Sequence, residues 1–329
     1  MTIATLMMIK FVADVTYFNN YDPDLPFHAR IASVEKKVDE ETDLPYRLEK
    51  VYFEARPGEE IPTLISFPID AAEPVPCIVF LHGIGQKKEF LNRICAPFNN
   101  AGFAMACFDQ HMQGERKVDG NPVAQVVAFR QRPWKTVNDT RRLIDYLETR
   151  GDIDAERMYL VGASYGAITG STATAFDKRI DAAVLVYGGG NIPKMLEAPM
   201  IRDEVGGALA LLKPIVSFIM RPADPVRYVH MISPRPVLFQ NGSRDRLVSP
   251  EGGKALQEAA REPKDITWYD SDHIGLDPDV VRQVLDEDLK WLLERDKPFR
   301  EEEPEEQGQS TRSQTRLGQS LTPELPAAA

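Results

Sequence analysis

Short apolar segments alternate with longer helical patterns from about residue 47 to residue 295, and this rhythm constrains the fold more than any other feature. Continuous apolar runs such as PCIVFLHG (76–83) and AAVLVYGG (182–189) are typical of strands that are buried on both faces. Parallel strands need crossover connections, and the helical segments between the runs provide them. The sequence therefore predicts an α/β fold with a mostly parallel sheet and helices on both faces.

The same pattern sets the expected elements. YRLEKVYFEA (46–55) and IPTLISFPI (61–69) suit an antiparallel pair at a sheet edge, where Pro62 is tolerated. Six further strands complete an expected eight-stranded sheet: 76–83, 103–109, 158–164, 182–189, 236–242 and 265–270. Helices are expected over 87–99, 136–149, 165–176, 250–260 and 278–295.

Composition divides the chain into segments around this sheet. Residues 1–45 are expected to form an N-terminal helical extension that begins with an amphipathic helix, and residues 46–296 to form the sheet domain. Residues 191–233 hold no clear strand but contain several prolines and an apolar stretch, so they predict a short helical insertion. Its apolar residues could cover a pocket as a lid or simply pack on the body, and periodicity does not separate the two. Residues 297–329 are rich in Glu, Gln, Ser, Thr and Pro, which predicts a disordered tail.

Charge and cysteine usage exclude several classes of protein. The formal net charge is -11, and Lys and Arg are scattered among more numerous Asp and Glu, which argues against nucleic-acid binding. Three cysteines without C-x-x-C spacing suggest neither a disulfide framework nor a zinc site, and a reducing cytoplasm fits best. No run of eighteen uninterrupted apolar residues occurs, so no membrane span is expected. Metal-ligand spacing and phosphate-cradling glycine patterns are also missing, and no cofactor is expected.

The run GASYG at 162–166 is a G-x-S-x-G motif in the context that its chemistry requires. It ends an apolar strand and opens a helical pattern, so Ser164 would lie on a sharp turn that presents its hydroxyl away from the sheet. Glycines fit beside such a turn because a Cβ would clash with the adjoining strand and helix. An inert serine in a glycine-flanked turn would fit the same letters. The placement favours a nucleophile.

From about Tyr46 to Arg295 the sequence resembles the α/β-hydrolase superfamily, nearest to its dienelactone-hydrolase and prolyl-oligopeptidase-like esterase branches. The resemblance is carried by HGIG (82–85), the run around Ser164, SPRPVL (233–238) and NGSRD (241–245). Dienelactone hydrolases have a cysteine nucleophile, whereas this chain has a serine. The resemblance therefore implies an α/β-hydrolase fold with esterase-like chemistry.

A serine hydroxyl needs a general base, and His273 is the expected one. Of the five histidines, only His273 lies in the loop after the last predicted strand, where the resemblance places the base. A surface histidine at a helix entry is the alternative. His82 ends the third strand and is expected to shape the neighbouring loop by hydrogen bonding. His111 could line the mouth of a pocket or lie in solvent.

Asp245 is the expected acid that orients His273. It follows the strand 236–242, so the order of the strands would bring it beside the loop that carries the histidine. An aspartate that only stabilises its own turn is the alternative. Asp272 is adjacent to His273, but neighbouring side chains of an extended segment point in opposite directions.

The backbone amides of Ile84 and Tyr165 are expected to form the oxyanion hole. The expected reaction is hydrolysis of a small-molecule acyl ester through an acyl-enzyme on Ser164. A peptidase or amidase, a thioesterase or a carbon–carbon bond hydrolase would use the same triad, and a non-catalytic binding protein would keep only the fold. The N-terminal helix could cover the pocket, join a homodimer or pack on the sheet.

Overall fold

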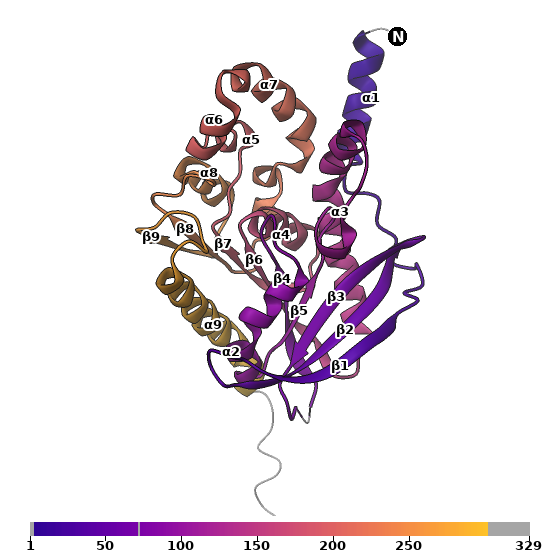
Figure 1. Cartoon of the computed structure of the whole chain (residues 1–329), viewed down its shortest axis with the longest axis vertical. Helices are drawn as coiled ribbons and strands as arrows, with labels where there is room; N and C mark the ends of the chain where they lie inside the picture. Colours follow the sequence, from indigo (N-terminus) through magenta and orange to yellow (C-terminus); the bar gives the residue numbers. More distant parts are fainter. Residues whose placement is uncertain (1–2, 72, 302–329) are drawn as a thin grey trace, which may run out of the picture.

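The computed structural model describes residues 3–71 and 73–301 and contains one nine-stranded sheet (Figure 1). Across the sheet the strands follow the order β1-β2-β3-β5-β4-β6-β7-β8-β9. The strands β4 to β9 are all parallel to one another. The strands β1, β2 and β3 pair antiparallel with their neighbours. The strands are β1 (Arg30–Val38), β2 (Pro45–Arg56), β3 (Glu59–Phe67), β4 (Val75–Leu81), β5 (Ala104–Phe108), β6 (Ile153–Ala163), β7 (Ile180–Val186), β8 (Val237–Gly242) and β9 (Lys264–Tyr269).

The ninth strand, β1, lies where the sequence predicted only a helical extension. Its residues RIASVEKKV are mostly exposed, because it is an edge strand that pairs with β2 alone. Charged residues such as Lys36 and Lys37 are typical of edge strands, where they hinder pairing with other chains. Because of these charges, the segment lacks the clear apolar alternation that predicts a strand. The prediction of an α/β-hydrolase sheet is correct, but its count of eight strands was one too few.

Helices cover both faces of the sheet and bury two apolar cores (Figure 1). On one face, α3 (Pro122–Glu148), α4 (Tyr165–Phe176) and α8 (Pro250–Ala259) pack against the strands. On the other face lie α2 (Cys95–Asn100) and α9 (Pro278–Glu301). The helix expected over 87–99 is instead a 3₁₀ turn, η1 (Lys88–Arg93), followed by the short α2. All seven residues of β4 are buried, as expected for a central strand.

Helix α3 starts fourteen residues before its predicted beginning at Thr136. The side chain of Asn121 accepts a hydrogen bond from the backbone N–H of Ala124 and so caps the helix, and Pro122 occupies the first turn. Pro133 lies inside the helix, which continues through it. Residues 122–131, for which the sequence predicted no helix, are therefore helical.

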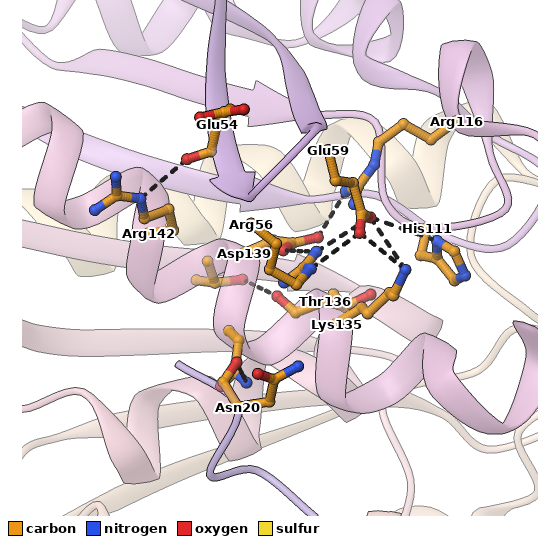
Figure 2. Close-up of polar contacts among 12 residues, drawn as sticks. Asn20, Glu54, Arg56, Glu59, His111, Arg116, Lys135, Thr136, Asp139 and Arg142 are labelled. Atoms are coloured by element: carbon orange, nitrogen blue, oxygen red, sulfur yellow. Dashed lines mark hydrogen bonds and ion pairs between the residues drawn. The ribbon is translucent and has the colours of Figure 1, made fainter. Parts of the chain in front are cut away.

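A buried ion network fastens α3 to the β2–β3 hairpin (Figure 2). The Glu59 carboxylate accepts hydrogen bonds from Arg56, Arg116 and Lys135, and Asp139 on α3 binds both arginines. Arg116 belongs to η2 (Gly114–Arg116), so the network also holds the loop after β5. These contacts fix the two segments that border one side of the active-site region.

The insertion between β7 and β8 is helical, as predicted. It contains α5 (Ile192–Met195), α6 (Pro199–Val205) and α7 (Leu209–Met220), and it rises above the ends of these strands in Figure 1. Val216 and Met220 pack on the body, whereas several apolar residues are exposed: Leu211, Leu212, Ile215, Phe218 and Ile219. Residues 199–223 are long and apolar enough to cross a membrane by length and composition alone, with a mean hydropathy of 1.3, but their helix is broken into short pieces.

Both ends of the described chain differ in part from expectation. Helix α1 (Ile3–Val15) exists, but it exposes apolar side chains such as Met8 and Phe11, and Lys10 lies 4.5 Å from the centre of the Phe218 ring on α7. Thus α1 contacts the insertion. Helix α9 continues to Glu301, six residues beyond its predicted end at Arg295. The rest of the predicted tail, 302–329, lies outside the described residues.

Candidate active site

Ser164 occupies a sharp turn between β6 and α4. Its backbone angles are φ 55° and ψ -116°, a conformation that a residue with a side chain adopts only when its surroundings enforce it. The amide N–H of Ser164 donates to the carbonyl of Val186 on β7 at 2.8 Å, and the carbonyl of Ser164 accepts from Ala167 and Ile168. The turn is therefore tied to both the sheet and the helix.

The two glycines of the motif are required by close backbone contacts. A Cβ on Gly166 would lie 1.8 Å from the carbonyl oxygen of Leu81, and a Cβ on Gly162 would lie 2.4 Å from the carbonyl oxygen of Gly166. Neither backbone atom can move away as a flexible side chain could. The glycines thus let α4 start directly against β4 and β6, as the motif predicts.

The structure brings together the three side chains predicted as nucleophile, base and acid. The Oγ atom of Ser164 lies 2.8 Å from Nε2 of His273, and Nδ1 of His273 lies 2.7 Å from Oδ2 of Asp245. Asp245 is 2% exposed, and its other oxygen accepts hydrogen bonds from the backbone N–H groups of Leu247 and Val248, each at 2.8 Å. These N–H groups stabilise the ionised carboxylate and hold it in one orientation.

Adjacent parallel strands explain why Asp245 and His273 meet. β8 and β9 end at the paired residues Gly242 and Tyr269, so the following loops leave the sheet at the same edge. The two loops are joined by a hydrogen bond of 2.9 Å from the amide of Arg244 to the carbonyl of Ser271.

Tyr187, just after β7, supports the histidine from the side. Its ring lies edge-on to the His273 ring with centroids 6.0 Å apart, and its hydroxyl is 2.5 Å from the Oγ atom of Ser271. Tyr187 is fully buried and has a positive φ of 54°. Burial raises the pKa of its hydroxyl, so the group stays protonated and can donate. No motif in the sequence distinguished this tyrosine from a core residue.

Asp272 binds backbone amides rather than the imidazole. Its Oδ1 atom accepts from the backbone N–H groups of Arg246 at 3.0 Å and His273 at 2.7 Å. Partial burial raises the pKa of this carboxyl, but the two N–H donors outweigh it, and the pKa is lowered. Asp272 therefore stabilises the loop that carries His273 rather than orienting its ring.

Two backbone amides in the segments next to the nucleophile have no acceptor: Tyr165 follows Ser164 directly, and Ile84 follows Gly83, where an added Cβ would lie 3.4 Å from the Cβ of Ser164. Among the described residues, neither N–H group has a protein acceptor: Ile84 is exposed, and Tyr165 is the first residue of α4, whose amide has no acceptor within the helix. The adjacent amides are occupied: Gly83 donates to the side chain of Gln86 at 2.9 Å, and Gly85 donates to Gln113 at 2.7 Å. These glutamines, which no sequence motif marks, hold the loop while the amide of Ile84 stays free.

His82 holds this loop through its ring and its backbone carbonyl. Its ring is buried, Nδ1 lies 3.0 Å from the carbonyl of Gly83, and its own carbonyl accepts from Gln110 at 2.7 Å. Burial lowers the pKa of His82, so the ring is neutral near pH 7. His111, whose position was left open, is also buried, and burial lowers its pKa to about 4. It lies 4.0 Å from Glu59 in the ion network of Figure 2.

Comparison with known proteins agrees with this fold. A model of the family described as serine aminopeptidase, S33, matches residues 72–232. The uncharacterized protein YfhR of Salmonella typhi is 24% identical over 239 residues, which cover 70% of this chain and 76% of that protein.

Two solved structures illustrate the similarity. The acetyl xylan esterase from Paenibacillus sp. R4 superposes with a TM-score of 0.67 and 18% identity, covering 86% of this chain and 93% of that one. A putative dienelactone hydrolase from Klebsiella pneumoniae gives a TM-score of 0.54 and 15% identity, covering 80% and 98%. The sheet order and the strand–serine–helix turn of this chain, together with these similarities, show that it has the α/β-hydrolase fold.

Proposed function

We propose that this chain is a serine esterase that hydrolyses a small carboxylic ester through an acyl-enzyme on Ser164. The observation that carries the proposal is the continuous chain of contacts from Ser164 Oγ to His273 and on to Asp245, at 2.8 and 2.7 Å. Both distances suit proton transfer between a nucleophile, a base and an orienting carboxylate.

Each side chain has a distinct step in the proposed reaction. His273 Nε2 takes the hydroxyl proton as Ser164 attacks the ester carbonyl, and Asp245 stabilises the imidazolium that forms. The same proton then passes to the departing alcohol. Water, activated by His273, attacks the acyl-enzyme and releases the acid. Both attacks develop negative charge on the carbonyl oxygen.

The unpaired amides of Ile84 and Tyr165 supply donors for that oxygen. Tyr165 is the first residue of α4, so the positive end of the helix dipole adds to the stabilisation. Donors that are fixed before the reaction need no reorganisation, and one such hydrogen bond is worth about 10²- to 10³-fold in kcat.

Turnover of simple esters tests the proposal. We expect the purified protein to hydrolyse 4-nitrophenyl acetate or butyrate, and Ser164→Ala to lose this activity. Ser243→Ala is the matched control, because Ser243 is exposed and lies in the loop before Asp245 without contacting His273. Wild-type rates in Ser164→Ala would contradict the proposal.

An aminopeptidase is the second candidate, favoured by the description of the matching family model. Recognition of a peptide's free amino group calls for a carboxylate near the nucleophile. In the cleft beside Ile84 the acids Glu89 and Glu115 are already paired with Lys88. This pairing favours the esterase. Faster turnover of aminoacyl 4-nitroanilides than of 4-nitrophenyl esters would reverse the choice.

A further inference from the structure

Arg132 on α3 is a buried cation without an anionic partner. Its side chain is 7% exposed, and its guanidinium lies over the ring of Tyr165 at 4.4 Å. Among the described residues, its buried Nε and Nη2 atoms have no hydrogen-bond acceptor. A buried charge normally has a paired carboxylate, because the loss of hydration is costly. The other buried arginines follow this rule: Arg116, Arg142 and Arg157 pair with Asp139, Asp145 and Asp296.

Arg132 borders a cleft of about 520 Å³ next to the unpaired amide of Ile84. Gln113 lines the same cleft and is 5% exposed. Its Oε1 atom accepts from Gly85, which orients the side chain and leaves the Nε2 donor buried without an acceptor. Two side chains that carry buried, unpaired donors therefore border one cleft, and they come from separate elements, α3 and the loop after β5.

The charges that line the cleft do not neutralise Arg132. The two acids that line the cleft, Glu89 and Glu115, form ion pairs with Lys88, and Glu115 is also paired with Lys50. Lys117 lines the cleft as well and forms no ion pair within residues 3–71 and 73–301. The cleft thus has an excess of positive charge and of hydrogen-bond donors, although the whole chain carries a net charge of -11.

We propose that Arg132 and Gln113 bind a carboxylate group of the substrate, so that the preferred ester carries a free acid as well as the scissile bond. This inference rests on the proposed function. The ester carbonyl would lie at the amides of Ile84 and Tyr165, and the carboxylate would occupy the cleft beside them. A guanidinium binds a carboxylate through two parallel hydrogen bonds, and such charged contacts discriminate strongly against neutral groups.

A purely supporting role for Arg132 would have a different signature. If the guanidinium only held the Tyr165 ring, its removal would disturb the oxyanion amide and would slow charged and neutral esters equally. Selective loss for charged esters distinguishes substrate binding from that role.

The test compares kcat/KM for the monomethyl esters of succinic, glutaric and adipic acid. Each ester is paired with a neutral analogue of the same length, in which an amide replaces the free acid. We expect the wild-type protein to prefer the best acid over its amide by about 10- to 100-fold in kcat/KM. Arg132→Gln should remove the preference and leave the amide within about threefold of wild type. Arg132→Lys should keep part of the preference, because it retains the charge but not the planar pair of donors.

Two further variants sharpen the result. Gln113→Glu can still accept from Gly85 but replaces the free donor with a negative charge, so it should weaken turnover of the acid beyond the effect of losing one hydrogen bond. Arg130→Gln is the control, because Arg130 lies two residues away on α3 and contacts Tyr17 instead. It should keep the wild-type preference.

Calorimetry with glutarate on the Ser164→Ala protein separates this inference from the proposed function. Binding that disappears in Ser164→Ala/Arg132→Gln supports the carboxylate site even if no ester is hydrolysed. Equal turnover of acids and amides by the wild type, an equal loss for both in Arg132→Gln, or no glutarate binding would overturn the inference.

Discussion

Asp245→Asn changes the chemistry of the site while preserving almost all of its contacts. In the structure, Oδ1 of Asp245 accepts from the amides of Leu247 and Val248, and Oδ2 faces Nδ1 of His273. The asparagine oxygen would keep the two amide hydrogen bonds, because its NH₂ group cannot accept them. The NH₂ group would then face Nδ1 and force the proton of the neutral imidazole onto Nε2.

An imidazole protonated at Nε2 cannot accept the proton of Ser164, so kcat should fall strongly. Loss of the correct tautomer costs on the order of 10⁴-fold in kcat for a serine triad, which corresponds to about 5.5 kcal/mol of barrier. The unfolding temperature should change little, since the buried hydrogen bonds to the loop remain. Stopped-flow measurement of the acylation burst and thermal unfolding, recorded on the same sample, give both quantities.

Asp272→Asn is the matched control for this prediction. Asp272 is the neighbouring acid, but it contacts only the backbone N–H groups of Arg246 and His273. An asparagine oxygen can accept the same bonds, and we expect kcat within about threefold of wild type. More than a tenth of wild-type kcat in Asp245→Asn, or a larger loss in Asp272→Asn, would refute the assignment of the orienting acid.

Other predictions concern stability. Gly166→Ala should destabilise the fold by more than about 4 kcal/mol in urea unfolding, because its Cβ would overlap the Leu81 carbonyl; a soluble variant with a wild-type midpoint would contradict the contact. Burial raises the pKa of Asp181 to about 6, so the folded protein takes up a proton as pH falls through 6 and becomes more stable. Asp181→Asn should therefore raise the free energy of unfolding by about 1–2 kcal/mol at pH 7 but not at pH 4. A larger gain at pH 4 than at pH 7 would contradict the raised pKa. Burial raises the pKa of Glu59, but Arg56, Arg116 and Lys135 outweigh it and lower the pKa well below 4.5. Its stabilisation is thus present above pH 4.5 and is lost at lower pH, so Glu59→Gln should cost about 3 kcal/mol at pH 7 and less at pH 3, as measured by thermal melts.

The central sheet and the positions of Ser164, Asp245 and His273 could be predicted because local patterns determine them. A buried strand followed by G-x-S-x-G fixes the turn, and strand order brings the loops after β8 and β9 together. Glycine contacts at 162 and 166 follow from the same geometry.

Features that depend on distant contacts were missed. The strand β1 is recognisable only by its pairing with β2, since its side chains are mostly charged and exposed. The start of α3 was also missed: the helix expected over 136–149 begins at Pro122, and the ion network around Asp139 fastens it to the β2–β3 hairpin. Arg132 and Tyr187 have no sequence motif, and their proximity to the site arises from tertiary packing alone.

Mass spectrometry of the protein after reaction with a fluorophosphonate tests the central claim most directly. We expect one covalent adduct per chain, located on the peptide that contains Ser164, and no adduct in Ser164→Ala or after denaturation. An adduct on another residue, or equal labelling of wild type and Ser164→Ala, would contradict the account.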